Sequence, residues 1–199
     1  MTNSVLFLPG VGADPNFWRA VGDRLPDTWA KTYLGWPGLG DQPHDPMVQS
    51  FDDMIAYAER HMGEGAVDIV AQSMGGAIAL QLALRHPGKV RRLVLTVTAG
   101  GLDVLGASDW RPDYAAEYPN AAPWILDARP DYTPDLPRVT QPTLLLWGDA
   151  DPISPVAIGE RLRDSLPNAR LHIITGGRHD LAVAHAEGVA PLIRAHLDM

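Results

Sequence analysis

The sequence predicts an α/β fold in which a mostly parallel sheet of about six strands carries helices on both faces. Two observations support this fold class: short apolar runs bounded by Gly or Pro recur along the chain, and stretches with helical spacing lie between them. Alternating strands and helices imply right-handed crossovers between parallel strands, which place ligands at the carboxyl ends of the strands. The length of 199 residues suits one domain.

Each expected element follows from its local pattern. The predicted strands are short and apolar, as strands buried on both faces are: Ser4–Leu8, Ala30–Leu34, Val67–Ala71, Leu93–Val97, Thr143–Trp147 and Leu171–Ile174. The predicted helices repeat apolar residues every three or four positions: Phe17–Leu25, Phe51–Met62, Met74–Arg85, Val156–Leu166 and Glu187–Leu197.

The segment 99–141 departs from this alternation. Its six prolines prevent long helices, and it also carries the aromatic residues Trp110, Tyr114, Tyr118, Trp124 and Tyr132. A connection of this length inside a compact domain is typical of a lid or binding loop. We therefore expect residues 1–199 to form a single domain in which 99–141 is a short lid or cap insertion; the alternative is a poorly ordered surface excursion.

The charge balance and the absence of cysteine exclude several classes of protein. Asp and Glu number 24 against 16 Lys and Arg, and a formal charge of −8 repels phosphate, so no nucleic-acid partner is expected. With no cysteine, the chain has no disulfide framework, thiolate nucleophile or cysteine metal site. It shows neither an export signal nor an apolar run of about 18 residues. We expect a cytoplasmic protein without a membrane partner, and its oligomeric state stays open.

A tight turn links one predicted strand to a predicted helix. The strand Val67–Ala71 runs directly into Gln72-Ser73-Met74-Gly75-Gly76 and then into the helix. A serine with a small residue two positions before it and a glycine two after can occupy a strained turn with its hydroxyl above the sheet. Ser73 is therefore a candidate nucleophile. The alternative is that Ser73 serves only as the N-cap of the helix.

Serine is a weak nucleophile near neutral pH, so this interpretation requires a base, normally histidine, and a carboxylate that orients the histidine. Both residue types follow later strands. Asp149 and Asp151 come directly after the strand Thr143–Trp147, and His179 follows the strand Leu171–Ile174.

With these residues in view, the sequence resembles the α/β-hydrolase superfamily, whose chain order of serine, acid and histidine is met by Ser73, Asp151 and His179. The resemblance covers nearly the whole chain: residues 8–12 look like the oxyanion loop and residues 36–40 like the glycine-rich loop after the next strand. It implies a catalytic triad of these three residues. Because Ser4–Leu8 already begins the match, it also implies a sheet smaller than that of many relatives.

The choice of acid depends on the resemblance. In the family the acid lies a few residues beyond the glycine that ends the strand, which favours Asp151, whereas Asp149 is expected to be a turn or capping residue. Some family members use the position of Asp103 instead, so Asp103 remains an alternative. Asp180 is too close to His179 along the chain to orient its ring.

Most of the seven histidines have structural explanations. His185 is the other candidate base, although the periodicity places it at the start of the last helix. The remaining five are expected to be structural: His44, His61 and His196 facing solvent, His86 at a helix end and His172 in a strand. No His, Asp and Glu residues have the spacing of a metal site, so neither a metal nor a cofactor is expected.

The resemblance also implies an oxyanion hole. The family uses the backbone N–H after the nucleophile and one from the loop after the first strand, which correspond to Met74 and Val11. Gly10 and Gly12 allow that loop to approach closely. Pro9 stands where a histidine often precedes the first glycine, which is a departure from the common pattern.

Large aromatic side chains are candidates for the substrate pocket. We expect Trp36, Trp110 and Trp124 to contact substrate, the alternative being that they simply pack the cover onto the body. Arg178 replaces a glycine that often precedes the histidine. It is a candidate for binding an anionic substrate or an ordinary surface arginine.

The resemblance implies a cofactor-independent serine hydrolase that cleaves a small ester, thioester or lactone through an acyl-enzyme intermediate. One alternative is a carbon–carbon bond hydrolase or lyase that uses the same triad. A second, from another class, is a non-catalytic small-molecule binding or receptor module. A nucleotide-binding oxidoreductase is disfavoured because Pro15 replaces the third glycine of the dinucleotide motif.

Overall fold

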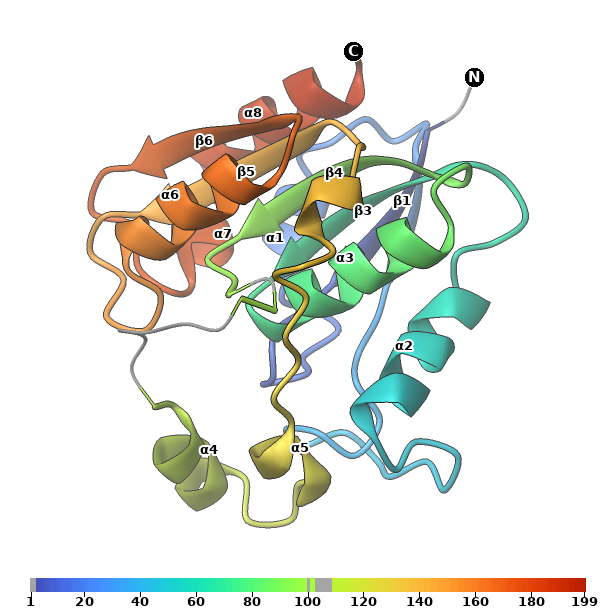
Figure 1. Ribbon diagram of the computed structural model, residues 1–199, viewed down its shortest axis with the longest axis vertical. Helices are drawn as coiled ribbons and strands as arrows, with labels where there is room; N and C mark the ends of the chain where they lie inside the picture. The colour runs from blue at the N-terminus through green and yellow to red at the C-terminus, as the bar shows by residue number, and fades with distance from the viewer. Residues whose placement is uncertain (1–2, 100, 103–108) are drawn as a thin grey trace.

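A six-stranded parallel sheet forms the centre of the computed structural model, which describes residues 3–99, 101–102 and 109–199 (Figure 1). In the order β2-β1-β3-β4-β5-β6, all neighbouring strands are parallel. The strands are β1 (Ser4–Leu8), β2 (Ala30–Tyr33), β3 (Val67–Gln72), β4 (Val90–Thr96), β5 (Thr143–Gly148) and β6 (Ala169–Ile174). The predicted fold class is confirmed.

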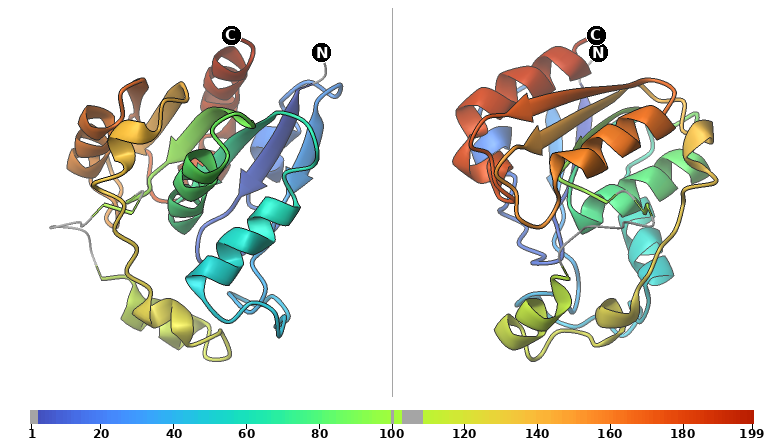
Figure 2. Two further views of the ribbon diagram at one scale, coloured as in Figure 1. Left: turned by 45° about the vertical axis from the view of Figure 1, so that its right-hand side comes forward. Right: turned by 60° about the vertical axis from the view of Figure 1, so that its left-hand side comes forward.

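Helices cover both faces of the sheet (Figure 2). One face carries α2 (Phe51–Arg60), α3 (Met74–Arg85) and α6 (Val156–Ser165), and the other carries α1 (Arg19–Gly22), α7 (Leu181–Ala184) and α8 (Ala186–Leu197). Most residues of α3 are buried, and α3 is accordingly rich in apolar residues. Fewer residues of α2 are buried, and this helix presents a polar face outward. None of the helices in the described ranges is both long and apolar enough to cross a lipid bilayer.

Of the predicted elements, β1 and α3 have the predicted bounds, and the others differ by one to three residues at one or both ends, most of all β4 and α1. The strand β4 begins at Val90 rather than Leu93, because the guanidinium of Arg91 pairs with the fully buried carboxylate of Asp68 on the adjacent strand. This ion pair brings a charged stretch into the sheet that an apolar pattern does not reveal. Helix α1 covers only Arg19–Gly22, and the chain around it forms turns.

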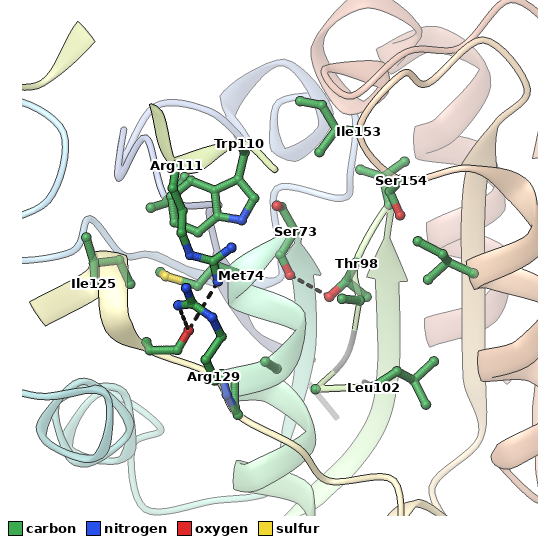
Figure 3. Close-up of a pocket in the computed structure, with 18 of the residues that line it drawn as sticks. Ser73, Met74, Thr98, Leu102, Trp110, Arg111, Ile125, Arg129, Ile153 and Ser154 are labelled. Carbon is green, nitrogen blue, oxygen red and sulfur yellow. Dashed lines mark hydrogen bonds between the residues drawn. The ribbon is translucent and has the colours of Figure 1, made fainter. Parts of the chain in front are cut away.

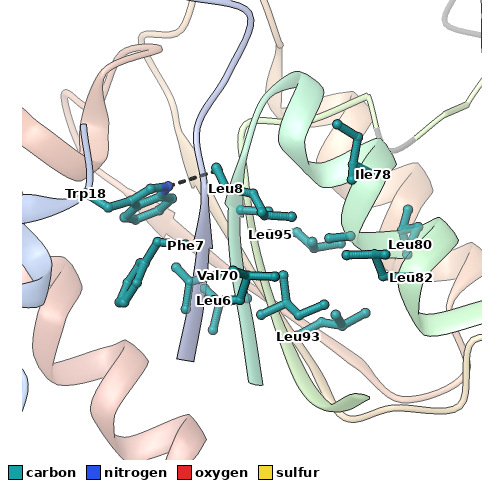
Figure 4. Close-up of a cluster of buried hydrophobic side chains, with 14 of the residues drawn as sticks. Leu6, Phe7, Leu8, Trp18, Val70, Ile78, Leu80, Leu82, Leu93 and Leu95 are labelled. Carbon is teal, nitrogen blue, oxygen red and sulfur yellow. Dashed lines mark hydrogen bonds between the residues drawn. The ribbon is translucent and has the colours of Figure 1, made fainter. Parts of the chain in front are cut away.

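The core lies on both sides of the central strands, which are apolar on both faces (Figure 4). Phe7 and Trp18 pack on one side of the sheet, and Ile78 and Leu80 of α3 pack on the other. The indole N–H of the buried Trp18 donates to the carbonyl oxygen of Leu8 at 2.9 Å, so its polar atom is satisfied at the end of β1.

The described part of the segment 99–141 contains the helices α4 (Arg111–Glu117) and α5 (Trp124–Asp127) and the 3₁₀ turn η1 (Leu136–Arg138). Figure 1 shows α4 and α5 beyond the end of the sheet at which the strand arrows point. Two hydrogen bonds join this segment to the loop after β2. The backbone N–H of Ala122 donates to the carbonyl oxygen of Gly38 at 2.7 Å, and the backbone N–H of Gly40 donates to the Tyr114 hydroxyl at 2.9 Å. The segment therefore faces the edge where the candidate site residues gather.

Candidate active site

Ser73 occupies a strained turn between β3 and α3. Its backbone φ of 51° and ψ of −121° lie in a region that residues other than glycine rarely adopt. Its side chain makes no capping hydrogen bond to the helix. A Cβ atom at Gly75 would lie 2.5 Å from the carbonyl oxygen of Pro9 and 2.8 Å from that of Leu8, so only glycine fits there. The turn thus aims the hydroxyl away from the helix and does not use it as an N-cap.

Three side chains from distant parts of the sequence meet at this turn. His179 Nε2 lies 3.0 Å from Ser73 Oγ, and His179 Nδ1 lies 2.8 Å from Asp151 Oδ2. Because the carboxylate can only accept, Nδ1 donates to Asp151 and Nε2 is left to accept from the serine hydroxyl. The other carboxylate oxygen accepts from the backbone N–H of Ile153 at 2.8 Å and of Ser154 at 3.0 Å. The Asp151 side chain is buried, which fixes this orientation.

The other acidic candidates occupy different places. Asp149 accepts a hydrogen bond from the N–H of Gly176 at 2.6 Å, which ties the turn after β5 to the turn after β6, in keeping with the turn role expected for it. Asp180 lines a cavity beside Ser73 but follows His179 directly in the chain. Asp103 lies outside the described residues.

Among the other histidines, the expectation for His196 is wrong. Its side chain is buried, and its Nε2 hydrogen-bonds the carbonyl oxygen of Leu93 at 3.0 Å. Burial is the main reason that the pKa of His196 is lower than usual. The sequence pattern did not predict this burial, because histidine is a polar residue and was expected on the outer face of the helix. His196 instead lies on the inner face of α8, one residue before the apolar Leu197. His185 lies at the junction of α7 and α8.

The expected oxyanion loop lies beside the serine. Met74 is the first residue of α3, so its backbone N–H has no acceptor in a preceding helical turn. Val11 lines the two cavities that meet at Ser73. The buried Trp36 donates its indole N–H to the carbonyl oxygen of Pro9 at 2.9 Å, and this hydrogen bond fixes the loop after β1 on the core side. Val11 thus lines the same two cavities as Ser73, and Met74 follows Ser73 directly in the chain.

Two cavities open on either side of Ser73 and His179. The larger, of about 520 Å³, has mostly apolar walls that include Met74, Leu102, Trp110, Ile125, Ile153 and Ile158 (Figure 3). The smaller, of about 320 Å³, is bounded by the loop from Pro9 to Asp14 together with Phe17, Gln72 and Tyr118. A substrate that spans the two cavities would place its reacting bond at Ser73.

The aromatic residues expected to contact substrate divide into two groups. Trp110 lines the larger cavity, whereas Trp36 and Trp124 line neither of the two. Trp36 is instead fully buried in the core, where its indole N–H is turned to the carbonyl oxygen of Pro9 and not to a cavity. Arg178 also lies outside both cavities, on the surface, while Arg111 and Arg129 line the larger one.

Two of the charged residues that line the larger cavity, Arg111 and Asp109, form an ion pair. Arg111 donates to Asp109 at 3.1 Å, and this hydrogen bond holds the pKa of Asp109 below its usual value. The same guanidinium donates to the carbonyl oxygens of Leu126 at 3.0 Å and Ala128 at 3.3 Å, which ties α4 to the chain after α5. In the described part of the chain, no three His, Asp or Glu side chains are grouped so that they could hold a metal ion.

Two residues that support the site were not anticipated from sequence. Gln72 donates from Nε2 to the carbonyl oxygen of His179 at 3.2 Å, and its Oε1 fills the space that a Cβ at Gly10 would take. Thr98 donates from Oγ1 to the carbonyl oxygen of Ser73 at 2.5 Å. The only signal for either was its place directly before the serine or directly after a strand.

Comparison with known proteins agrees with this geometry. The family described as alpha/beta hydrolase fold matches residues 3–129, and the family described as TAP-like protein matches residues 109–199. A pimeloyl-acyl-carrier-protein methyl ester esterase of Neisseria meningitidis serogroup C is 30% identical, with 96% of this chain and 91% of that protein covered. A poly(3-hydroxyalkanoate) depolymerase of Ectopseudomonas oleovorans is 29% identical, with 97% and 83% covered.

Solved structures show the same fold. A thermophilic esterase from Thermogutta terrifontis superposes with a TM-score of 0.83 at 22% identity, covering 100% of this chain and 90% of the other. The alignment with the Neisseria esterase runs over 239 positions, more than the 199 residues of this chain, so that relative carries insertions that this chain lacks. The chain belongs to the α/β-hydrolase family and is an enzyme of that family.

Proposed function

We propose that this protein is a serine hydrolase that cleaves small carboxylic esters through an acyl-enzyme intermediate. The observation that carries the proposal is the chain of contacts from Ser73 through His179 to Asp151, at 3.0 and 2.8 Å, with the serine in a strained turn. A serine, a base and a buried acid in this order are what nucleophilic acyl transfer needs. The named relatives that hydrolyse esters lend further support.

In the proposed mechanism, Ser73 Oγ attacks the ester carbonyl carbon while His179 Nε2 takes the hydroxyl proton. The backbone N–H groups of Val11 and Met74 stabilise the tetrahedral oxyanion, and His179 then gives its proton to the departing alkoxide. A water molecule, deprotonated by His179, attacks the acyl-enzyme, the bond between the acyl carbon and Ser73 Oγ breaks, and His179 returns the proton to Oγ as the acid is released. Asp151 keeps the imidazole in the required tautomer throughout.

The two cavities suggest how a substrate would bind. The larger cavity has mostly apolar walls and a volume of about 520 Å³, which suits an acyl chain of moderate length. The smaller cavity adjoins the oxyanion loop and would hold the alcohol portion, whose oxygen must lie within reach of His179. Thioesters and lactones present the same carbonyl chemistry and fall within the proposal.

A labelling experiment tests the proposal directly. A fluorophosphonate probe should modify the wild-type protein at Ser73, and p-nitrophenyl acetate and butyrate should be hydrolysed. Ser73→Ala should abolish both. Ser165→Ala is the matched control, because Ser165 lies at the surface end of α6 and its hydroxyl donates only to the carbonyl oxygen of Arg161, at 2.8 Å.

The same assay separates the alternatives. Folded wild-type protein that neither reacts with the probe nor hydrolyses the esters would favour a non-catalytic binding module. Labelling without ester hydrolysis would favour carbon–carbon bond hydrolysis or a lyase step on the same three residues.

A further inference from the structure

The hydroxyl of Ser154 has no hydrogen-bond partner among the described residues although the residue is only 4% exposed. Its backbone is fully engaged: the N–H donates to Asp151 Oδ1 at 3.0 Å, and the carbonyl oxygen accepts from the indole of Trp147 at 2.9 Å. These two hydrogen bonds fix the backbone of the residue, but neither of them involves its side chain. A buried hydroxyl that no protein atom satisfies needs an explanation.

The location of Ser154 supplies one. Ser154 lines the larger cavity together with Ser73 and Thr98, and Figure 3 shows all three residues. The neighbouring residues on that wall, Ile153 and Ile158, are apolar. The Thr98 hydroxyl already donates to the carbonyl oxygen of Ser73 at 2.5 Å. Ser154 is therefore a polar residue beside apolar ones on the cavity wall, and its hydroxyl oxygen is itself covered in this structure.

This wall is close to the reacting centre. Ser154 lies three residues after Asp151 in the loop whose acid orients His179, and the same loop forms the cavity wall next to Ser73. Ser73 and Ser154 line the same cavity, so an acyl group attached to Ser73 Oγ that fills this cavity would contact Ser154. Binding through this oxygen requires a rotation about the Cα–Cβ bond to another staggered rotamer, and this rotation breaks no hydrogen bond because the hydroxyl has no partner among the described residues.

We infer that Ser154 is a specificity-determining residue that binds a hydroxyl or keto oxygen on the acyl chain, close to the ester carbonyl. The inference rests on the proposed function, because it assigns the acyl group to the larger cavity. A serine hydroxyl both donates and accepts, so it pairs with either type of oxygen. An unsubstituted acyl chain would leave the hydroxyl buried and unpaired, which disfavours that substrate.

The test compares three methyl esters of equal chain length: butanoate, 3-hydroxybutanoate and 3-oxobutanoate. Methanol release gives kcat/KM for each. The wild-type protein should prefer the oxygenated esters by roughly three- to tenfold, the range that one net hydrogen bond supplies. Ser154→Ala should reduce this preference to near one, and Ser154→Thr, which restores a hydroxyl, should recover part of it.

Ile158→Val is the matched control, because it removes one methyl group from the same wall and no polar atom. It should keep the wild-type preference whatever its effect on overall rate. Melting temperatures of all variants check folding, and Ser154→Ala should melt no lower than wild type because it removes an unpaired hydroxyl.

The outcomes separate the two proposals. A wild-type preference of one or less, or an equal preference in wild type and folded Ser154→Ala, overturns the role of Ser154 while hydrolysis of methyl butanoate upholds the ester hydrolase. If the wild-type protein hydrolyses none of the three esters and a fluorophosphonate does not label Ser73, the proposed function fails and the assignment of Ser154 fails with it.

Discussion

Trp36 donates its indole N–H to the carbonyl oxygen of Pro9 at 2.9 Å, which joins the loop after β2 to the loop after β1. The same two loops touch again where a Cβ at Gly40 would lie 2.2 Å from the carbonyl oxygen of Gly12. The loop after β1, which contains Val11, is therefore held in place by its contacts with the loop after β2. The position of the proposed oxyanion donor depends on a residue that lines neither cavity.

Replacing Trp36 by Phe should lower kcat by roughly tenfold with little change in KM, because the unpaired carbonyl of Pro9 lets the oxyanion loop shift. The free energy of unfolding should fall by about 1–3 kcal/mol, as expected for a buried acceptor that loses its donor. Steady-state kinetics and urea unfolding measure the two effects. Trp18→Phe is the control, because its indole N–H is bound in the same way to Leu8 at 2.9 Å in the core. Equal losses of kcat in both variants would argue against a specific role for Trp36.

Ser73→Ala and His179→Ala should each reduce kcat by about four to six orders of magnitude, and the double variant should lose little more. In the proposed mechanism the two side chains, 3.0 Å apart, transfer one proton between them, so that removing either one disables the same step. Ester hydrolysis by highly purified protein measures the loss. Losses that multiply in the double variant would show that the two residues act independently.

Gly75→Ala should destabilise the protein by about 1–3 kcal/mol and reduce activity at least roughly tenfold. The added methyl group would meet the carbonyl oxygens of Pro9 and Leu8 at 2.5 and 2.8 Å, and neither backbone atom can move without shifting the turn. Gly188→Ala is the opposite case, since nothing lies within 4 Å of its Cβ position in α8. That variant should gain about 0.5–1 kcal/mol by helix propensity. Thermal and urea unfolding of both variants would contradict this account if the two changes had the same sign.

Stability should fall as the pH drops below about 6.5, in part because of His196. Burial lowers the pKa of this imidazole in the folded state, so the unfolded chain binds the proton more readily. Its contribution is therefore fully present above the unfolded pKa and is lost as the pH falls through the folded one. Urea unfolding of wild type and His196→Gln between pH 8 and 5 should show a smaller pH dependence in the variant. Parallel curves would exclude His196 as a source of the acid sensitivity.

The centre of the sheet could be predicted from the sequence because β1, β3 and β5 are buried on both faces and appear as mostly apolar runs, whereas the edge strands β2 and β6 are partly exposed and carry polar residues. Ser4–Leu8 and Met74–Arg85 have the predicted bounds. The predicted strand at β4 is too short because β4 has charged residues near its start, which an apolar pattern does not identify as strand; one of them, Arg91, forms an ion pair with Asp68. The helices α4 and α5 were not predicted. Each is short and lies in a proline-rich stretch where local propensity is weak, so packing against the loop after β2 determines its position.

The three candidate catalytic residues could be located from sequence because each follows a strand end, and parallel strands bring those ends to one edge. Residues that act through packing could not. Trp36 was expected in the pocket, but periodicity does not reveal which carbonyl an indole N–H will satisfy. Ser154 gave no signal at all, because its importance arises from the absence of a hydrogen-bond partner, and that depends on the folded neighbourhood.

The wide spacing of Ser73 and His179, which are 106 positions apart, has a consequence for biosynthesis. A ribosome completes β1, β3 and the serine turn long before it makes β6 and the histidine that follows. A nascent or prematurely terminated chain that stops before His179 would carry an inert serine. In the proposed mechanism, every translation product that ends before His179 therefore lacks the base, and hydrolysis begins only after the last strand has joined the sheet.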